Sequence, residues 1–412
     1  MSSVTEVSGG PAHGRERDLT TGHLWQVDIV RLFTFVAVII VHAIAFTELP
    51  SNHLAGGALM VLQFGRAVFF TISGFVLVHA TRGSTPPAVG FWRRRLFLVG
   101  VPYAAWTAVY EVDAALTAHG SLSAAHFGTD LLTGGAEYHL YFLLVTMQLY
   151  LVFPLLLRFV RRSADRWAAV LGVVGVANVA WLAALQYVGA PRGWFGDLWP
   201  HAYQLLPTYA VFVLAGCYAA VHLPRLQALV SEQGHRLLAG AFVAAVFAEL
   251  VYVSQLGSMD TRVAADVLQP AMLLTWSAAA VALYVAASRW AAGERRGLQA
   301  VAVASEISFG VYLAHPLVLQ LVLARGLGND NQRLAAPAAT LVAIVATTVG
   351  SAAVALVASR SRLSLALTWR PRRTGVRPPS PAFPEISKHP HKPRSTPAQI
   401  LSSWTPGSEL TR

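Results

Sequence analysis

The sequence predicts an all-α, polytopic membrane protein of about ten transmembrane helices, with a disordered tail at each end. Two observations predict this class. Hydrophobic residues make up 55% of the 412 residues and charged residues only 12%, about half the charged share of a typical soluble domain. Apolar runs long enough to cross a bilayer also follow one another along most of the chain. We therefore expect a disordered N-terminus over 1–24, a membrane domain over 25–357, and a basic, proline-rich tail over 358–412.

Each expected helix corresponds to one apolar run separated from the next by a short polar segment. The sixth run is broken by Pro207, and the eighth starts beside Asp266 and Pro270. The runs cover 27–46, 58–80, 97–116, 138–157, 168–187, 205–222, 237–256, 267–287, 301–323 and 335–357.

The positive charges are concentrated in every second segment that connects the apolar runs. Most of the 31 lysines and arginines lie in alternate connecting segments or in the tail, and the other segments hold only Arg192, Arg262, Arg325 and Arg333. This bias is typical of membrane proteins whose basic segments stay in the cytoplasm. We expect a multi-pass protein of a bacterial inner membrane with both termini cytoplasmic. The net charge of +11 then reflects topology and contact with anionic lipids, not nucleic-acid binding.

Three ionisable residues stand out in the first run because charges inside a membrane helix are costly. Asp28 and Arg31 are one turn apart and can pair on one face. Arg31 and His42 are eleven residues apart, which is three turns, so they are nearly eclipsed and separated by roughly 16 Å. An alternative interpretation is that Asp28 and Arg31 anchor the helix at the headgroups and that His42 is interfacial.

Polar residues in the next two runs allow both a functional and a structural interpretation. Arg66 either extends toward the headgroups or binds an anionic or carbonyl group. Ser73 and the adjacent glycine either line a site or allow a neighbouring helix to approach closely. The arginine triplet of residues 93–95, namely Arg93, Arg94 and Arg95, either sets the topology or binds phosphates, for which arginine is well suited.

Polar residues also mark the fourth and ninth runs. His139 begins the fourth run among aromatic residues, as a member of an interfacial belt or as a site residue. Ser308, Tyr312 and His315 are spaced by four and three residues, so they share one helix face and indicate a polar cavity lining. Glu306 falls on a different face.

The predicted orientation groups these residues by depth. His42, His139 and His315 all fall in the outer half of the membrane, and the arginine triplet lies at the inner face. This separation favours a donor that enters from the cytoplasm and an acceptor that is met farther out. A carrier or flippase for a glycolipid or hydrophobic metabolite would also need a polar lining, and it stays an alternative. The sequence contains no recognisable metal-ligand set, and Cys217 is its only cysteine.

Several of these motifs, in this order and spacing, resemble those of the membrane acyltransferase 3 family. The resemblance covers about residues 25–357. It is carried by Arg31 followed ten residues later by His42, by Phe69-Phe70-Thr71-Ile72-Ser73-Gly74-Phe75, by Phe91 to Arg95 with Pro102-Tyr103, by His139-Leu140-Tyr141-Phe142-Leu143, and by Ser308-Phe309-Gly310-Val311-Tyr312-Leu313-Ala314-His315-Pro316.

The resemblance implies an integral-membrane O-acyltransferase. Such an enzyme moves an acetyl or another short acyl group from acyl-CoA to a hydroxyl of a glycan or a small molecule. Acyl-CoA would be a co-substrate, with no bound cofactor and no metal, and the remaining partners would be membrane lipids.

The resemblance also implies roles for the residues already singled out. In the catalytic group His42 would be the general base, Asp28 and Arg31 would shape the donor path, and Tyr312 and His315 would stabilise an oxyanion or position the acceptor. Two further groups follow: Arg93, Arg94 and Arg95 would bind CoA phosphates, and Arg66, His139 and Ser73 would bind substrate.

Overall fold

The structure, a computed structural model, describes residues 23–82, 85–117, 122–327 and 334–370, and every regular element in these ranges is a helix. This confirms the predicted all-α class. Most of the expected N-terminal tail and the chain beyond Arg370 lie outside the described residues. The helices are α2 (Trp25–Thr47), α3 (His53–Leu62), α4 (Gly65–Ala80), α5 (Ala88–Thr117), α6 (Ala124–Thr133), α7 (Tyr141–Arg162), η1 (Ala164–Arg166), α8 (Trp167–Tyr187), α9 (Trp194–Leu198), η2 (Trp199–Gln204), η3 (Leu206–Tyr209), α10 (Ala210–Val221), α11 (Leu223–Gln255), α12 (Thr261–Ala264), α13 (Met272–Ala292), α14 (Leu298–Leu323), α15 (Ala336–Arg360) and α16 (Ser364–Thr368).

The described chain contains eight helices, or nine counting one bent pair, that are long and apolar enough to cross a membrane. Each of the ten apolar runs forms helix, so the difference from about ten lies in two places. The sixth run forms η3 and α10, and these helices are bent by 44° from the preceding helical segment that ends at Gln204. The third run forms the 30-residue helix α5, which is rich in aromatic residues and carries Glu111 and Asp113 near its end. It is therefore too polar to count as a span by hydropathy.

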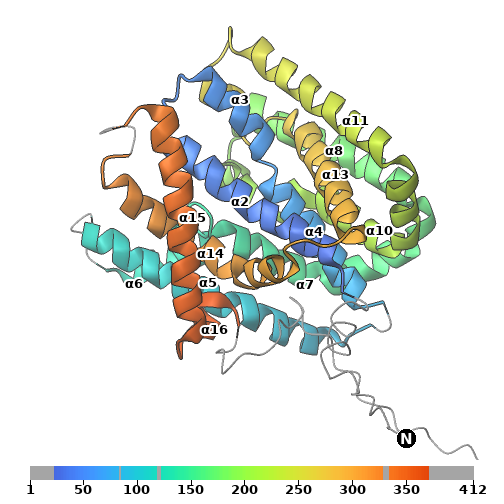
Figure 1. Ribbon diagram of the computed structural model, residues 1–412, viewed down its shortest axis with the longest axis horizontal. Helices are drawn as coiled ribbons and strands as arrows, with labels where there is room; N and C mark the ends of the chain where they lie inside the picture. Colours follow the sequence, from blue (N-terminus) through green and yellow to red (C-terminus); the bar gives the residue numbers. More distant parts are fainter. Residues whose placement is uncertain (1–22, 83–84, 118–121, 328–333, 371–412) are drawn as a thin grey trace, which may run out of the picture.

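Helix α2 lies in the middle of the bundle, with α4, α13, α14 and α15 packed around it (Figure 1). The long helix α11 lies on the opposite side of the molecule from α15 and covers α13. Because α2 is surrounded, its polar residues face other helices and not lipid. This central position is what brings the first-run residues into a site.

Two glycines allow α4 and α10 to pack closely. A Cβ atom on Gly74 would lie 2.3 Å from the Val213 carbonyl oxygen, and one on Gly216 would lie 1.9 Å from the Thr71 carbonyl oxygen. Real Cβ atoms do not approach backbone this closely, so only glycine fits at both positions. Small residues at a helix crossing are a common means of association in membranes, where lipid is as apolar as the side chains. Gly74 thus marks a helix contact, as one of the two interpretations predicted.

The chain after α15 continues to pack on the bundle. Residues 358–370 were assigned to the tail, but α15 extends to Arg360 and α16 follows it. The Trp106 indole donates a hydrogen bond to the Leu367 carbonyl, and the Trp369 ring lies 5.3 Å from that of Phe309. Polar and arginine-rich composition hid this segment, which places Trp369 and Arg370 beside the interior of the bundle.

We predict that Gly216→Ala destabilises the protein, because the added methyl group must displace the α4 backbone. Overpacking of this kind typically costs about 1–3 kcal/mol. Thermal unfolding of the purified protein in detergent should show a clearly lower midpoint. Gly172→Ala on α8 is the matched control, since a Cβ there meets nothing within 4 Å. Equal tolerance of the two substitutions would contradict the close packing of α4 on α10.

Candidate active site

A polar anchor joins the first and ninth apolar runs at one end of α2. The Ser305 hydroxyl donates a 2.7 Å hydrogen bond to Asp28, and His23 contacts the other carboxylate oxygen. Arg31 lies 3.4 Å from the same Asp28 oxygen that Ser305 binds and 3.5 Å from the Ser305 hydroxyl. Asp28 and Arg31 therefore share one face, as their spacing predicts, and this face contacts Ser305 of α14.

The other end of α2 carries a chain of hydrogen bonds from His42 through His315 to a backbone carbonyl. His42 Nδ1 lies 3.1 Å from His315 Nε2, and His315 Nδ1 contacts the Tyr312 carbonyl oxygen. A carbonyl oxygen only accepts, so Nδ1 of a neutral His315 carries the proton and its Nε2 is an acceptor. His42 Nδ1 must then be the donor, which leaves the lone pair of His42 on Nε2. The position of one carbonyl therefore fixes the tautomers of both histidines.

Four aromatic side chains from α2, α4, α7 and α14 form a closed ring in the bundle. Successive ring centroids are 6.3 Å apart for Phe35 and Phe69, 4.4 Å for Phe69 and Phe142, 5.7 Å for Phe142 and Tyr312, and 5.5 Å for Tyr312 and Phe35. All four line two separate cavities. We call these four residues the aromatic ring. It lies between a space that holds His42 and a space that holds Arg31.

The first space, here named the His42 cavity, encloses about 420 Å³ including its opening. Arg66 lies in it, with its guanidinium 5.9 Å from the Tyr141 ring centroid. Tyr138 packs 4.3 Å from His42, and no described residue hydrogen-bonds its buried hydroxyl. His139 also lines the cavity and lies edge to face with His315 at 5.2 Å. Three histidines from α2, the segment before α7, and α14 thus meet at one end of the bundle.

The second space, here named the Arg31 cavity, encloses about 800 Å³ including its opening. Ser73 and Ser308 lie on its wall. Trp369 and Arg370 from the chain after α16 also line it, and Arg370 forms a 3.2 Å ion pair with Glu306. Glu306 was expected on a different face from the Ser308 stripe, yet both residues line this cavity. The Arg31 cavity therefore has two guanidinium groups and the Glu306 carboxylate on an otherwise largely apolar wall.

The three successive arginines at the start of α5 do not share one face of the helix. Successive residues on a helix point about 100° apart. Arg95 is buried and lies 5.9 Å from the ring of Tyr150, which lines the Arg31 cavity. Arg93 and Arg94 are exposed on the outside of the bundle. The structure therefore places one of the three near a cavity.

Tyr312 and His315 have their donors engaged within the protein. The Tyr312 hydroxyl donates a 2.8 Å hydrogen bond to the His139 carbonyl, and His315 is fully buried behind His42. A tyrosine hydroxyl has one proton to give. In this geometry both residues position other groups, and neither offers a donor to the His42 cavity.

Three parts of the site were missed by the sequence analysis. Ser305 continues the Ser308 stripe by one more turn, and this spacing alone could have revealed it. Tyr138 was not singled out among the aromatic residues around His139. Arg370 could not be found, since only the packing of α16 brings it to the cavity.

Comparison with known proteins identifies the family of the chain. A family model described as an acyltransferase domain, that of acyltransferase 3, matches residues 24–356. The chain belongs to the acyltransferase 3 family. No curated protein and no solved structure matches the chain significantly. This acyltransferase is therefore a membrane protein. The region that matches the family model contains His42 and His315, whereas Trp369 and Arg370 lie beyond it.

We predict that Ser305→Ala destabilises the acyltransferase, because a buried carboxylate loses its closest hydroxyl donor. Leaving such a group unsatisfied costs about 1–3 kcal/mol. The thermal midpoint in detergent should fall relative to Ser351→Ala. Ser351 is also fully buried in a helix, and its hydroxyl has no hydrogen-bond partner among the described residues. Equal midpoints for the two variants would show that the Asp28 anchor contributes nothing to stability.

Proposed function

We propose that this acyltransferase moves an acetyl or another short acyl group from acyl-CoA to a hydroxyl of a glycan or small-molecule acceptor. The thioester donor occupies the Arg31 cavity, the acceptor occupies the His42 cavity, and the acyl carbon lies at the aromatic ring between them. The enzyme acts in a bacterial inner membrane, with the Arg31 cavity toward the cytoplasm, where most of the basic segments lie.

The observation that carries this proposal is the shared wall of the two cavities. Phe35, Phe69, Phe142 and Tyr312 border both spaces, while Arg31 lines one of them and His42 the other. A two-substrate reaction needs two binding spaces that meet at one reacting atom, because holding both reactants in place supplies much of the rate. The aromatic side chains also exclude water, which would otherwise hydrolyse the donor.

The hydrogen-bond chain gives His42 the form that a general base needs. Nε2 of His42 takes the proton of the acceptor hydroxyl while its oxygen attacks the thioester carbon. The C–S bond then breaks, and the proton passes from His42 to the departing thiolate. His42 is cationic in between, and its Nδ1–H continues to donate to neutral His315. His315 and the Tyr312 carbonyl thus position His42 without touching either substrate.

Two groups in the His42 cavity are suited to the negative charge that develops on the carbonyl oxygen. The buried Tyr138 hydroxyl is a donor without a partner among the described residues, next to His42. Arg66 supplies a positive charge in the same space. Donors that are fixed before the reaction stabilise an oxyanion strongly in a water-poor site.

The Arg31 cavity is suited to an anionic donor. Guanidinium groups bind phosphate oxygens through two parallel hydrogen bonds. Arg31 and Arg370 flank the cavity, and Arg95 lies beside its Tyr150 wall. These residues replace Arg93 and Arg94 as the proposed contacts to the CoA phosphates.

We predict that His42→Ala and His42→Gln each lower acyl transfer by about 10²-fold or more, the usual contribution of a positioned base. Transfer is measured with radiolabelled acetyl-CoA in membranes and with purified protein, using hydroxyl acceptors from cell-surface glycan and small-molecule libraries. His235→Ala, an exposed histidine on α11, is the control and should keep full activity.

Near-normal transfer by both folded His42 variants would remove His42 from the reaction. Wild-type protein that neither transfers nor hydrolyses any acyl-CoA, but moves a glycolipid across liposomes, would support a carrier instead.

We predict that Arg370→Ala raises KM for acetyl-CoA by about tenfold, as expected for the loss of a hydrogen bond to a charged group. The variant should leave KM for acetyl-pantetheine, which lacks the phosphates, nearly unchanged. Arg296→Ala is the control, because Arg296 is exposed and pairs only locally with Glu294. An equal rise in KM for acetyl-CoA and for acetyl-pantetheine would mean that Arg370 shapes the cavity without binding phosphate.

A further inference from the structure

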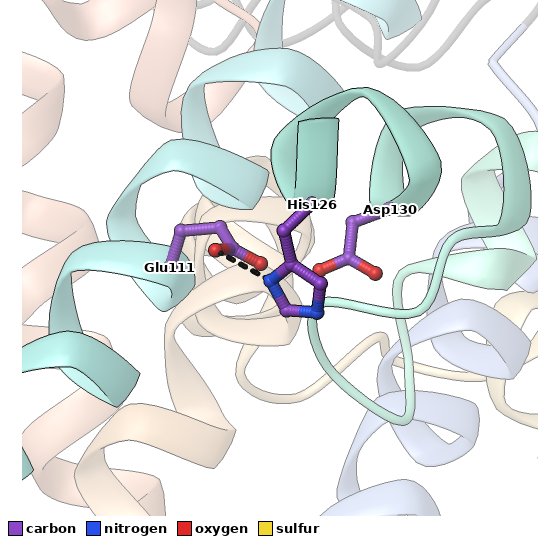
Figure 2. Close-up of side chains that lie close together, drawn as sticks. All are labelled: Glu111, His126 and Asp130. Atoms are coloured by element: carbon purple, nitrogen blue, oxygen red, sulfur yellow. Dashed lines mark hydrogen bonds and ion pairs between the residues drawn. The ribbon is translucent and has the colours of Figure 1, made fainter. Parts of the chain in front are cut away.

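A second cluster of ionisable side chains lies outside both cavities. Glu111 belongs to the last turns of α5, and His126 and Asp130 lie one turn apart on α6, so they share a helix face. Their side chains converge on one point (Figure 2). One ligand atom of each residue lies within 4.8 Å of the others, and His126 Nδ1 is 3.1 Å from a Glu111 oxygen.

The burial of the two carboxylates in this cluster needs compensation. Asp130 is 7% exposed and Glu111 is 8% exposed. The Asp130 carboxyl group lies within hydrogen-bonding reach of the Glu111 carboxyl group and faces His126 (Figure 2). Two adjacent buried carboxylates repel each other unless a proton or a cation lies between them. The exposed His126 ring adds a nitrogen ligand at the same point.

These three residue types form a set that transition metals favour. Zinc binds histidine nitrogen and carboxylate oxygen at about 2.0–2.2 Å in a tetrahedral arrangement, so its ligand atoms lie about 3.4 Å apart. His126 Nδ1 and the Glu111 oxygen are already close to this separation, at 3.1 Å. The exposed His126 side chain can move so that all three ligand atoms reach this spacing. Three protein ligands leave a fourth position for water. Magnesium would instead demand octahedral oxygen ligands.

We propose that Glu111, His126 and Asp130 form a binding site for a divalent transition metal, with zinc as the best match. The site lies outside the acyl-transfer chemistry and does not depend on it. Its role follows from what it connects, namely the end of α5 and the peripheral helix α6.

The metal would hold in place the segment that carries Tyr138 and His139. The Tyr103 hydroxyl already ties the end of α6 to α5 through the carbonyls of Asp130 and Leu131. The chain then turns at Gly134, with φ of 70°, and leads to His139, which packs edge to face on Tyr110. Tyr110 precedes the ligand Glu111. A metal at Glu111 therefore stabilises one wall of the His42 cavity.

The test uses full-length protein purified in detergent, freed of its affinity tag and depleted of metal by chelation. Zinc chloride is titrated by calorimetry, and bound zinc is counted by elemental analysis after desalting. We expect one zinc ion per chain for wild type. His126→Ala and Asp130→Asn should each weaken binding by at least about tenfold, while the exposed control His235→Ala should bind as wild type does.

His126→Ala keeps the proposal falsifiable, because His126 is exposed and its loss should not disturb folding. Zinc should also raise the thermal midpoint and slow amide exchange over residues 124–140 in wild type, but not in His126→Ala. Failure of wild type to bind stoichiometric zinc, or unaltered binding by His126→Ala, overturns the proposed site.

Discussion

The contact between His42 and His315 is the interaction on which the site depends. It joins two histidines on different helices that are 273 residues apart in the chain, and it fixes the tautomer of both rings. The Tyr312 carbonyl acts as the fixed point, because it can only accept a hydrogen bond. The carbonyl accepts a hydrogen bond from His315 Nδ1, so His315 Nε2 must accept one from His42 Nδ1. His42 Nε2 therefore keeps its lone pair. A neutral partner behind the base provides orientation, with less charge stabilisation than a carboxylate would give.

The bundle around this contact explains why charged residues are tolerated within apolar helices. Helix α2 is enclosed by α4, α13, α14 and α15, so its ionisable side chains meet other protein groups instead of lipid. Asp28 is satisfied by Ser305 and His23, and this anchor fixes α14 against α2 at one end. The histidine contact fixes the same two helices at the other end. The aromatic ring between the two anchors is consequently held from both sides.

Much of the fold could be predicted, because a bilayer forces each span to be a long apolar helix. Every apolar run became helix, and the spacing of Arg31 and His42 placed them along one stripe. Features that depend on the relation between helices could not be predicted. The division into two cavities, the contribution of Arg370, and the convergence of Glu111 with His126 and Asp130 all arise from packing. The three side chains of the arginine triplet point in different directions for a simpler reason, since consecutive helical residues cannot share a face.

Nitrogen NMR of the purified protein, labelled with ¹⁵N at histidine, tests the central claim most directly. The signals of His42 are assigned by their loss in His42→Gln, and one-bond couplings reveal which nitrogen carries the proton. Our account predicts a neutral His42 ring with the proton on Nδ1 and a bare Nε2. A ring protonated on Nε2 and bare on Nδ1 would contradict it, because the nitrogen assigned to take the acceptor's proton would already hold one.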